Sequence, residues 1–441
     1  SGFIHIFSPK TRYNEEAESF FMSEQQTPQK KQNIVRFPTS KKERRKLLQE
    51  SKDKRVQLVR TLRRACGWLL VIGAFLFVLT NYRLLTPSSL RSLAEYTVAG
   101  LRQHEGDITT INYQNGAFSD GALFETGLAY ADNDALYLAR PGSVVSMTCS
   151  LGYSSPVVET SDSYVLVYDR GGMEAMLTNS AAPTAELTLS SPILTGSIGQ
   201  DGRFVLVTDE QGYRTAVTIY DTSGEEVFKY QSSEYYIVSA ALSPDGKTLA
   251  VLAFLQNGVA LDSHVLFYNV SNGELNANAT LSDALGIQLC YLENGTAAVL
   301  CDDGIYLVRR NGSAEHVLTV ASSDLIAVSS SGNAMAVAAR SYSGGARADL
   351  YTVRGSTFDG PFGLTEEPTA LAVSAAGTAV LSASGVSVYD SDFDPLWHNA
   401  EAIGARRLLM TETGTVYALY TKNARIFTAH SEQSEEITNA E

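Results

Sequence analysis

The sequence predicts an all-β fold, a β-propeller of eight blades, preceded by one transmembrane helix. Three observations support this prediction. A strand–turn–strand pattern recurs every 35–49 residues. The last copy of the pattern lacks a strand, while an unassigned strand precedes the first copy. A long uncharged apolar stretch lies upstream of all copies, directly after a basic segment.

The repeat is clearest in Ala241–Phe254, "ALSPDGKTLAVLAF", where a strand of small residues leads through Ser-Pro-Asp-Gly into an alternating apolar strand. Four short strands per unit at this period are typical of propeller blades. We expect glycine at the first turn of each unit to supply the positive φ that a two-residue connection needs. These turns fall near Gly127, Asp162, Gly202, Gly246, Gly295, Gly332, Gly377 and Gly414.

The second strand of each unit, as in "YVLVY", "FVLVT" and "AAVLC", is apolar on both faces. This is expected for a sheet packed between two others. The last unit, "RLLMTETGTVYALYTKNARIFTAH", supplies only three strands. Pairing with "DITTINYQ" (Asp107–Gln114) would complete it and remove an exposed edge. This predicts eight blades, with seven as the alternative if the weak first copy is miscounted.

The charge is distributed unevenly over the 441 residues. Residues 1–64 carry 16 Lys and Arg against 7 Asp and Glu, and the remainder carries 18 against 41. The body therefore has a net charge of −23, which argues against nucleic acid as its partner.

The stretch Ala65–Thr80, "ACGWLLVIGAFLFVLT", is uncharged and continues through two leucines past Arg83. A helix crossing a bilayer needs roughly 20 apolar residues. Because "KKERRK" and "RTLRR" directly precede it, the N-terminus is expected in the cytoplasm and the remainder outside. A cleaved signal peptide is disfavoured, since about sixty residues come first. We therefore interpret the segment as a single-pass signal anchor.

The domain organisation follows from these patterns. We expect a basic, mostly disordered cytoplasmic tail (1–64), a transmembrane helix (65–86), a stalk (87–106), the propeller (107–430) and a polar C-terminal tail (431–441). "MSEQQTPQKK" from Met22 resembles a natural start, so residues 1–21 are interpreted as an upstream extension or a non-native leader.

One segment resembles a calcium loop. In "DSDFDPLWHNAE", Asp390, Asp392 and Asp394 take the first, third and fifth positions, with glutamate at the twelfth. The sixth position should be glycine and is proline. Asp390 also aligns with Asp221 and Asn269 of other copies, which makes it a turn residue between outer strands. No metal site is predicted.

Four cysteines are present, with Cys66 in the apolar segment and Cys149, Cys290 and Cys301 in the body. A two-residue Asn-Gly turn would place Cys290 opposite Val299, so that the sulfurs of Cys290 and Cys301 share one face as diagonal neighbours. That separation is about 7–8 Å, too long for an easy disulfide. The cysteines are interpreted as small buried hydrophobic residues.

Catalytic motifs are missing from the sequence. It contains no GxSxG or HExxH pattern, no histidine that recurs in the repeat and no glycine-rich phosphate loop. Trp397 is the one tryptophan of the body, whereas quinone-dependent propellers use repeated tryptophans to dock their blades. Neither catalytic residues nor a cofactor are predicted, and the binding residues stay unassigned.

The basic tail, the apolar segment, "PVVETSDSYVLVYDRGG" and "LSPDGKTLAVL" together resemble an uncharacterised family of Firmicutes single-pass membrane proteins with propeller-like ectodomains, a domain of unknown function. The resemblance covers roughly residues 40–430 and implies a location in the bacterial cell envelope. It transfers no catalytic residue to this chain.

These observations favour a non-catalytic binding or scaffolding module that presents loops to a protein, peptide or glycan outside the cell. The alternatives are a quinoprotein- or hydrolase-like enzyme that uses the central channel, and a sensor whose signal crosses the membrane helix. Convergent Arg, His and carboxylate groups at the channel mouth would favour the enzyme. A broad exposed aromatic or acidic face would favour the binding module.

Overall fold

The computed structural model describes residues 62, 64–69, 71–72, 109–292, 295–342, 345 and 347–429, and the chain divides into two compact units, Ser1–Phe77 and Val78–Glu441. The described residues of the first unit are helical and exposed. Within the described residues, no helix has the length and apolar character needed to cross a membrane. The expected tail 1–64 and membrane segment 65–86 lie largely outside the described residues, and the stalk 87–106 and tail 431–441 lie wholly outside them.

The second unit contains eight four-stranded antiparallel sheets, which we number as blades 1 to 8 from the N-terminal side. Blade 1 contains β2 (Asp120–Phe124), β3 (Gly127–Ala131), β4 (Ala135–Arg140) and β5 (Val144–Ser150), and blade 2 contains β6 (Pro156–Thr160), β7 (Val165–Asp169), β8 (Glu174–Thr178) and β9 (Pro183–Thr188). Blade 3 contains β10 (Ile193–Ile198), β11 (Phe204–Thr208), β12 (Thr215–Tyr220) and β13 (Glu226–Ser232), and blade 4 contains β14 (Tyr236–Leu242), β15 (Thr248–Asn257), β16 (Ala260–Asn269) and β17 (Leu275–Leu281).

Blade 5 contains β18 (Gly286–Tyr291), β19 (Thr296–Cys301), β20 (Gly304–Arg309) and β21 (Ala314–Thr319), and blade 6 contains β22 (Leu325–Ser331), β23 (Ala334–Arg340), β24 (Ala348–Arg354) and β25 (Thr357–Leu364). Blade 7 contains β26 (Ala370–Ser374), β27 (Gly377–Ser382), β28 (Gly385–Tyr389) and β29 (Pro395–Asn399), and blade 8 contains β30 (Arg407–Met410), β31 (Val416–Leu419), β32 (Asn423–Phe427) and β1 (Thr110–Asn112). Short 3₁₀ turns in the described part of the chain are η2 (Gln114–Gly116), η3 (Ser322–Asp324) and η4 (Ala400–Ala402).

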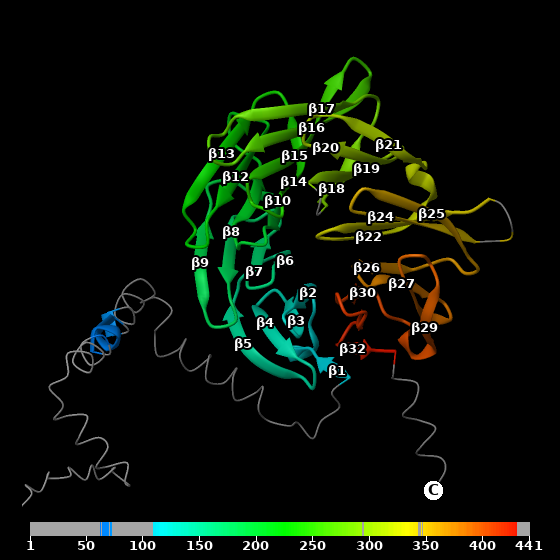
Figure 1. Cartoon of the computed structure of the whole chain (residues 1–441), viewed down its shortest axis with the longest axis horizontal. Coiled ribbons are helices and arrows are strands. Elements are labelled where there is room, and N and C mark those ends of the chain that lie inside the picture. Colours follow the sequence, from blue (N-terminus) through cyan, green and yellow to red (C-terminus); the bar gives the residue numbers. More distant parts are fainter. Residues whose placement is uncertain are drawn as a thin grey trace, which may run out of the picture. The chain divides into compact units, whose positions relative to one another are not determined.

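The chain is an eight-bladed β-propeller, as the repeat predicts. The first strands of the blades surround the centre and the fourth strands lie at the periphery (Figure 1). Blade 8 has the order β1-β32-β31-β30, so the strand predicted near the N-terminal side completes the last sheet. β1 pairs antiparallel with β32, with Ile111 opposite Ala424. Closure confirms eight blades rather than seven.

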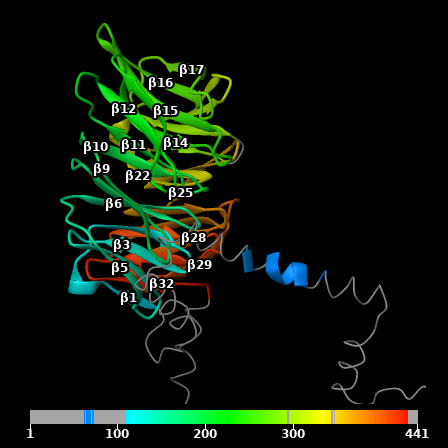
Figure 2. The ribbon, with the colours of Figure 1, turned by 90° about the vertical axis from the view of Figure 1, so that its left-hand side faces the viewer.

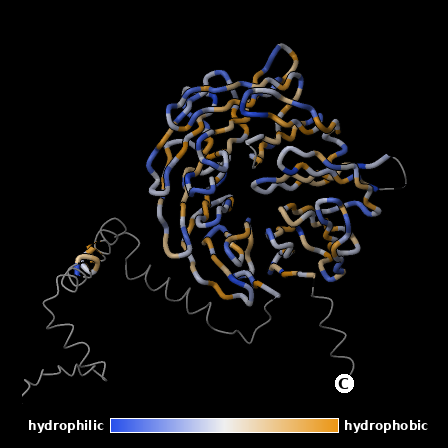
Figure 3. The backbone as a smooth tube through the Cα atoms, viewed as in Figure 1, coloured by the Kyte–Doolittle hydropathy of each residue, from blue (hydrophilic) through white to orange (hydrophobic). Residues whose placement is uncertain are grey.

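The hydrophobic core lies between neighbouring blades. Val205 of β11, for example, belongs to the same buried cluster as Ile237 and Leu249 of blade 4. The second strands β7, β11 and β19 are buried at every residue, as expected for sheets packed on both faces. Hydrophobic residues follow the strands inside the blades, and many peripheral connections are hydrophilic (Figure 3).

The glycines at the first turns act in two different ways. Gly202, Gly246 and Gly295 have φ values of 82°, 64° and 76°, which confirms the positive φ expected at these turns. Gly127 and Gly332 are not in the positive-φ region, so the prediction is wrong at both positions. A Cβ at Gly127 would lie 2.1 Å from the backbone oxygen of Ala139, so this glycine permits close strand approach instead.

The predicted register of the cysteines is also wrong. Leu292 N–H donates to Thr296 O over 2.8 Å, so the connection is longer than a two-residue turn. Cys290 consequently pairs with Ala298, not Val299. Because a shift of one residue turns a side chain to the other face of a sheet, Cys290 packs toward blade 6 and Cys301 toward blade 4. Both thiols are free and buried.

The antiparallel order gives the ring two different faces. Each first strand begins at one face, which we call the entry face, and ends at the other, which we call the turn face. The entry face carries the connections from second to third strands and from each blade to the next. Figure 2 shows the ring from the side, with connections projecting on both faces.

Candidate functional site

The entry face carries most of the exposed large hydrophobic side chains of the described ring. Eight of eleven such residues lie in its connections or at the first or second residue of an inner strand, namely Met173, Leu194, Tyr213, Tyr236, Val259, Ile287, Tyr342 and Ile403. The other three, Val227, Leu275 and Leu396, lie on outer strands. A concentration of this kind is typical of an interaction surface.

A β-bulge recurs at the start of four consecutive inner strands. In β10, β14, β18 and β22 the pairing with the second strand skips one residue, which is in turn Leu194, Val238, Ile287 and Ile326. The corresponding pairings in blades 1, 2, 7 and 8 show no such shift. A bulge redirects the extra side chain out of the regular alternation. All four extra residues are aliphatic, and Leu194 and Ile287 are exposed.

An aromatic group stands beside these bulges between blades 3 and 4. Tyr236 stacks on Phe254 with 5.2 Å between ring centroids. The guanidinium of Arg214 lies 4.5 Å from the centre of the Tyr236 ring, and its Nε donates to Ser233 O over 3.1 Å. Phe254 belongs to the ten-residue strand β15, which with β16 forms a hairpin extending beyond the entry face to Val259.

Carboxylates accompany the apolar residues over blades 4 to 6. Asp262 accepts hydrogen bonds from Asp283 N–H (2.9 Å) and Asn257 Nδ2 (2.8 Å). Asp302 accepts one from Leu285 N–H over 2.7 Å, and Asp324 accepts one from the Tyr342 hydroxyl over 2.7 Å. These bonds hold the carboxylates in place. None of the four aspartates makes an ion pair with a residue that the structure describes.

A second polar group lies on the innermost strands of blades 8, 1 and 2. Asp120 of β2 pairs with Arg407 of β30 and accepts a hydrogen bond from Val158 N–H of β6 over 2.9 Å, so it links blades 8, 1 and 2. Glu159 follows Val158 and is half-buried. Burial and the Asp120 carboxylate raise the pKa of Glu159 to about 7, against the opposing effects of Arg407 and Arg170. This carboxyl group therefore titrates near neutral pH.

Glu159→Gln is expected to stabilise the ring at pH 8 and to leave it unchanged at pH 4. The folded-state pKa lies above the ordinary value of 4.5, so the stabilising contribution of the proton is full below pH 4.5 and is lost as the pH rises through 7. Removing the charge should recover about 1–3 kcal/mol at pH 8, since one pKa unit corresponds to about 1.4 kcal/mol and the site is partly solvated.

The measurement is the free energy of urea unfolding at pH 4, 6 and 8. Glu186→Gln, on the exposed part of outer strand β9, is the matched control and should show no such trend. A constant difference between Glu159→Gln and the unmodified chain over this pH range would contradict the assignment.

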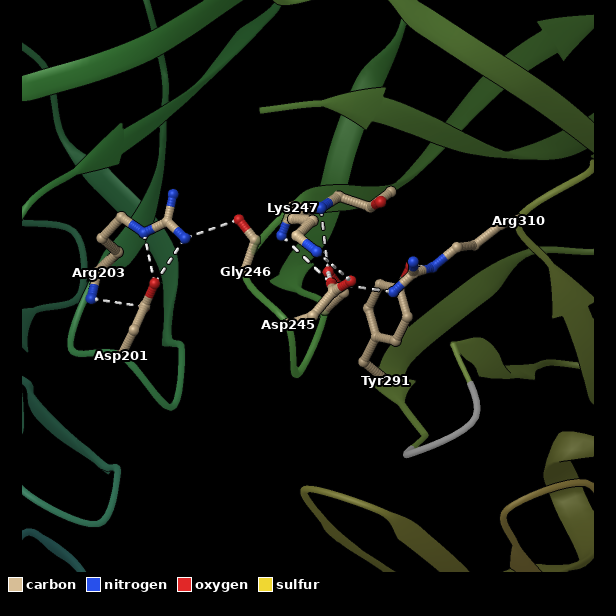
Figure 4. Close-up of polar contacts among 9 residues, drawn as sticks. Asp201, Arg203, Asp245, Gly246, Lys247, Tyr291 and Arg310 are labelled. Atoms are coloured by element: carbon tan, nitrogen blue, oxygen red, sulfur yellow. Dashed lines mark hydrogen bonds and ion pairs between the residues drawn. The ribbon is translucent and has the colours of Figure 1, made fainter. Parts of the chain in front are cut away.

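The turn face carries a network of polar contacts across blades 3, 4 and 5 (Figure 4). Arg203 pairs with Asp201 within the first turn of blade 3, and its Nη2 donates to Gly246 O of blade 4 over 2.7 Å. A Cβ at Gly246 would lie 2.1 Å from Arg203 Nη2, so an added side chain would displace the guanidinium from this contact. The arginine thus joins two consecutive turns.

Asp245 continues this network from blade 4 to blade 5. It accepts from Arg310 Nη2 over 3.2 Å, and Arg310 Nε donates to the Tyr291 hydroxyl over 3.1 Å (Figure 4). The Ser243 hydroxyl, Lys247 N–H and Arg310 lower the pKa of Asp245 to about 2, against the effect of burial. The charges pair with one another, which indicates a role in joining blades rather than in ligand binding.

The aspartates with calcium-like spacing lie in the connection between β28 and β29. Asp390 Oδ1 accepts hydrogen bonds from Asp392 N–H and Asp394 N–H, both over 2.9 Å. Asp221 makes the same pair of bonds with backbone N–H groups two and four residues on, as the alignment of the repeats predicts. Among the described residues, no three His, Cys, Asp or Glu side chains are grouped to hold a metal ion.

Comparison with known proteins places the chain in a family. Residues 108–359, more than half of the chain, match the family of unknown function DUF5711. The chain belongs to this family. The match covers blades 1 to 5 of this DUF5711 protein and most of blade 6. It therefore includes all four bulged strands, β10, β14, β18 and β22. No curated protein matches the chain.

Solved structures share the fold of this DUF5711 member. The crystal structure of Saccharomyces cerevisiae Sqt1 matches with a TM-score of 0.52 at 12% identity, covering 73% of this chain and 98% of that one. The C-terminal WD40 domain of Sif2 matches with a TM-score of 0.45 at 14% identity, covering 73% and 97%. At such identities the likeness to Sqt1 concerns the fold alone.

The sequence did not identify the entry-face residues or the polar group on the innermost strands. The four bulge residues have no common motif, and Asp120 and Arg407 are 287 positions apart. One signal was present, since the stretch from Asp283 to Asp324 holds several aspartates in predicted connections.

Proposed function

We propose that this DUF5711 protein is a membrane-anchored, extracytoplasmic propeller that acts as a non-catalytic binding or scaffolding module in the bacterial cell envelope. The observation that supports binding is the concentration of exposed large hydrophobic side chains on the entry face of the described ring. Burial of such residues against a partner is favourable, and a surface of this kind is characteristic of association.

The proposed location rests on the sequence. The uncharged stretch within residues 65–86 and the basic residues before it favour one membrane helix with a cytoplasmic N-terminus. The ring would then lie outside the membrane, where a protein, peptide or glycan can reach it. The acidic character of the body argues against nucleic acid.

Crosslinking of the tagged full-length protein in its native membrane, followed by affinity capture and mass spectrometry, tests this proposal. We expect reproducible recovery of one envelope protein or complex, and loss of that recovery when Tyr213 and Tyr236 are both replaced by serine. Val227→Ser combined with Leu275→Ser is the control, because these exposed residues lie away from the entry face. Absence of any partner, together with a small molecule bound to the purified protein, would contradict the proposal.

A second candidate function uses the central channel. Asp120, Glu159 and Arg407 converge there from three blades, and Glu159 exchanges a proton near neutral pH. Such a group is suited to general acid–base chemistry in a hydrolase-like or quinoprotein-like enzyme, or to a ligand sensor. Loss of a copurifying small molecule in Glu159→Gln, with partner capture unchanged, would favour this function.

A further inference from the structure

We propose that the entry face over blades 3 to 6 binds an extended segment of a partner protein that presents apolar side chains between lysines and arginines. We call this surface the apolar arc and define it by the four bulge residues and their exposed neighbours Tyr236 and Tyr342. The inference rests on the proposed binding function and adds the face, the residues and the chemistry of the partner.

The bulges are the first support for the arc. They occur in four consecutive blades, and each places one aliphatic side chain outside the regular pairing near the start of an inner strand. Val238 and Ile326 rest partly on the core between blades, whereas Leu194 and Ile287 belong to no buried cluster and are 40% and 46% exposed. Aliphatic side chains form no hydrogen bonds, so contact with them favours apolar side chains of the partner.

The charge along the arc is the second support. Asp262 lies near the start of β16, and Asp283, Asp302 and Asp324 lie in connections that follow it in blades 4 to 6. None of the four makes an ion pair with a described residue. Hydrogen bonds from the backbone or from Tyr342 fix three of these carboxylates in position. A partner with lysine or arginine beside its apolar residues would meet complementary charge, which favours rapid and specific association.

Other occupants fit these features less well. A second copy of the ring would bring its own acidic surface against the arc, because the body has a net charge of −23. Nucleic acid would be repelled for the same reason. A glycan would need many hydrogen-bonding groups around an aromatic plane, whereas the repeated element of the arc is a branched aliphatic side chain. A basic, apolar peptide satisfies both the charge and the apolar surface.

A random peptide library displayed on phage and selected on the immobilised full-length protein tests the arc. We expect selected peptides to combine lysine or arginine with aliphatic or aromatic residues. The dissociation constant of one synthetic selected peptide is then measured by fluorescence anisotropy. Leu194→Ser combined with Ile287→Ser should weaken binding by about tenfold or more, as is typical of central apolar contacts. Leu275→Ser combined with Leu396→Ser, at 50% and 52% exposure, should change it by less than about twofold.

Charge is tested separately with substitutions that preserve shape. Asp283→Asn combined with Asp324→Asn should weaken binding and reduce its dependence on salt. Asparagine tolerates the positive φ of Asp283 and can still accept the Tyr342 hydrogen bond at position 324. Asp392→Asn combined with Asp394→Asn is the control, because these exposed aspartates lie in a connection at the turn face. Thermal melting of each variant verifies that the ring is folded.

The outcomes separate the arc from the proposed function. Selected peptides without basic residues, or peptides whose affinity responds only to the control substitutions, would overturn the arc while leaving a binding function in place. Failure to select any peptide would also overturn it. If membrane crosslinking recovers no partner either, the proposed function fails as well.

Discussion

Gly304→Ala is expected to destabilise the ring by about 3 kcal/mol or more, because it combines a forbidden backbone conformation with a steric overlap. Gly304 begins β20 with a φ of 142°, a region that is essentially restricted to glycine. A Cβ at this position would lie 1.8 Å from the backbone oxygen of Leu318 on β21. β21 would have to move away from the added carbon. The pairings of β20 with β19 and with β21 in blade 5 would be disturbed, because both include Gly304.

The free energy of urea unfolding measures this effect. Gly332→Ala is the matched control, because Gly332 lies in the connection of β22 to β23 and nothing lies within 4 Å of the added carbon. Its stability should stay within about 0.5 kcal/mol of the unmodified protein. Equal stabilities of the two variants would contradict the strand geometry assigned to blade 5.

Ile111→Ala is expected to lower the free energy of unfolding by about 2–5 kcal/mol, the range for truncating a fully buried aliphatic side chain. Ile111 is the central residue of β1 and is completely buried, packing with Tyr130 of blade 1 and Leu419 of blade 8. β1 has only three residues, so this side chain provides most of its buried contact. Its loss also leaves the edge of β32 without a stable partner.

Urea unfolding and limited proteolysis test this second prediction together. We expect a lower unfolding midpoint and faster cleavage near residue 110 in Ile111→Ala. Asn112→Ala, in the same strand with its side chain exposed, should behave as the unmodified chain within about 0.5 kcal/mol. Unchanged cleavage in Ile111→Ala would show that ring closure does not depend on this contact.

The blade architecture was predictable because its determinants are local. Turn residues, a strand apolar on both faces and a fixed spacing recur within each unit, and each reflects the chemistry of a few neighbouring residues. The incomplete last unit and the unpaired strand before the first indicated closure, which the pairing of β1 with β32 confirms.

Local patterns were misleading where one residue decides the outcome. The Asn-Gly pair before Thr296 suggested a two-residue turn, but the structure uses a longer connection, and Cys290 turns to the opposite face. At Gly127 the pattern indicated positive φ, while the structure uses the missing side chain to accommodate the neighbouring strand. Both features depend on a second strand whose position the local sequence does not specify.

The sequence by itself determined the repeat and predicted eight blades and the means of closing the ring, because burial and turn chemistry operate within each unit. Only the tertiary structure decided what the faces of the ring present. Asp120 meets Arg407 across 287 positions because closure brings blades 1 and 8 together. Leu194, Val238, Ile287 and Ile326 form one arc because each lies at a bulge near the start of an innermost strand, at the same face of the ring. A bulge depends on the pairing of two strands, and a shared face depends on the rotation between blades, so neither can be read from one strand alone.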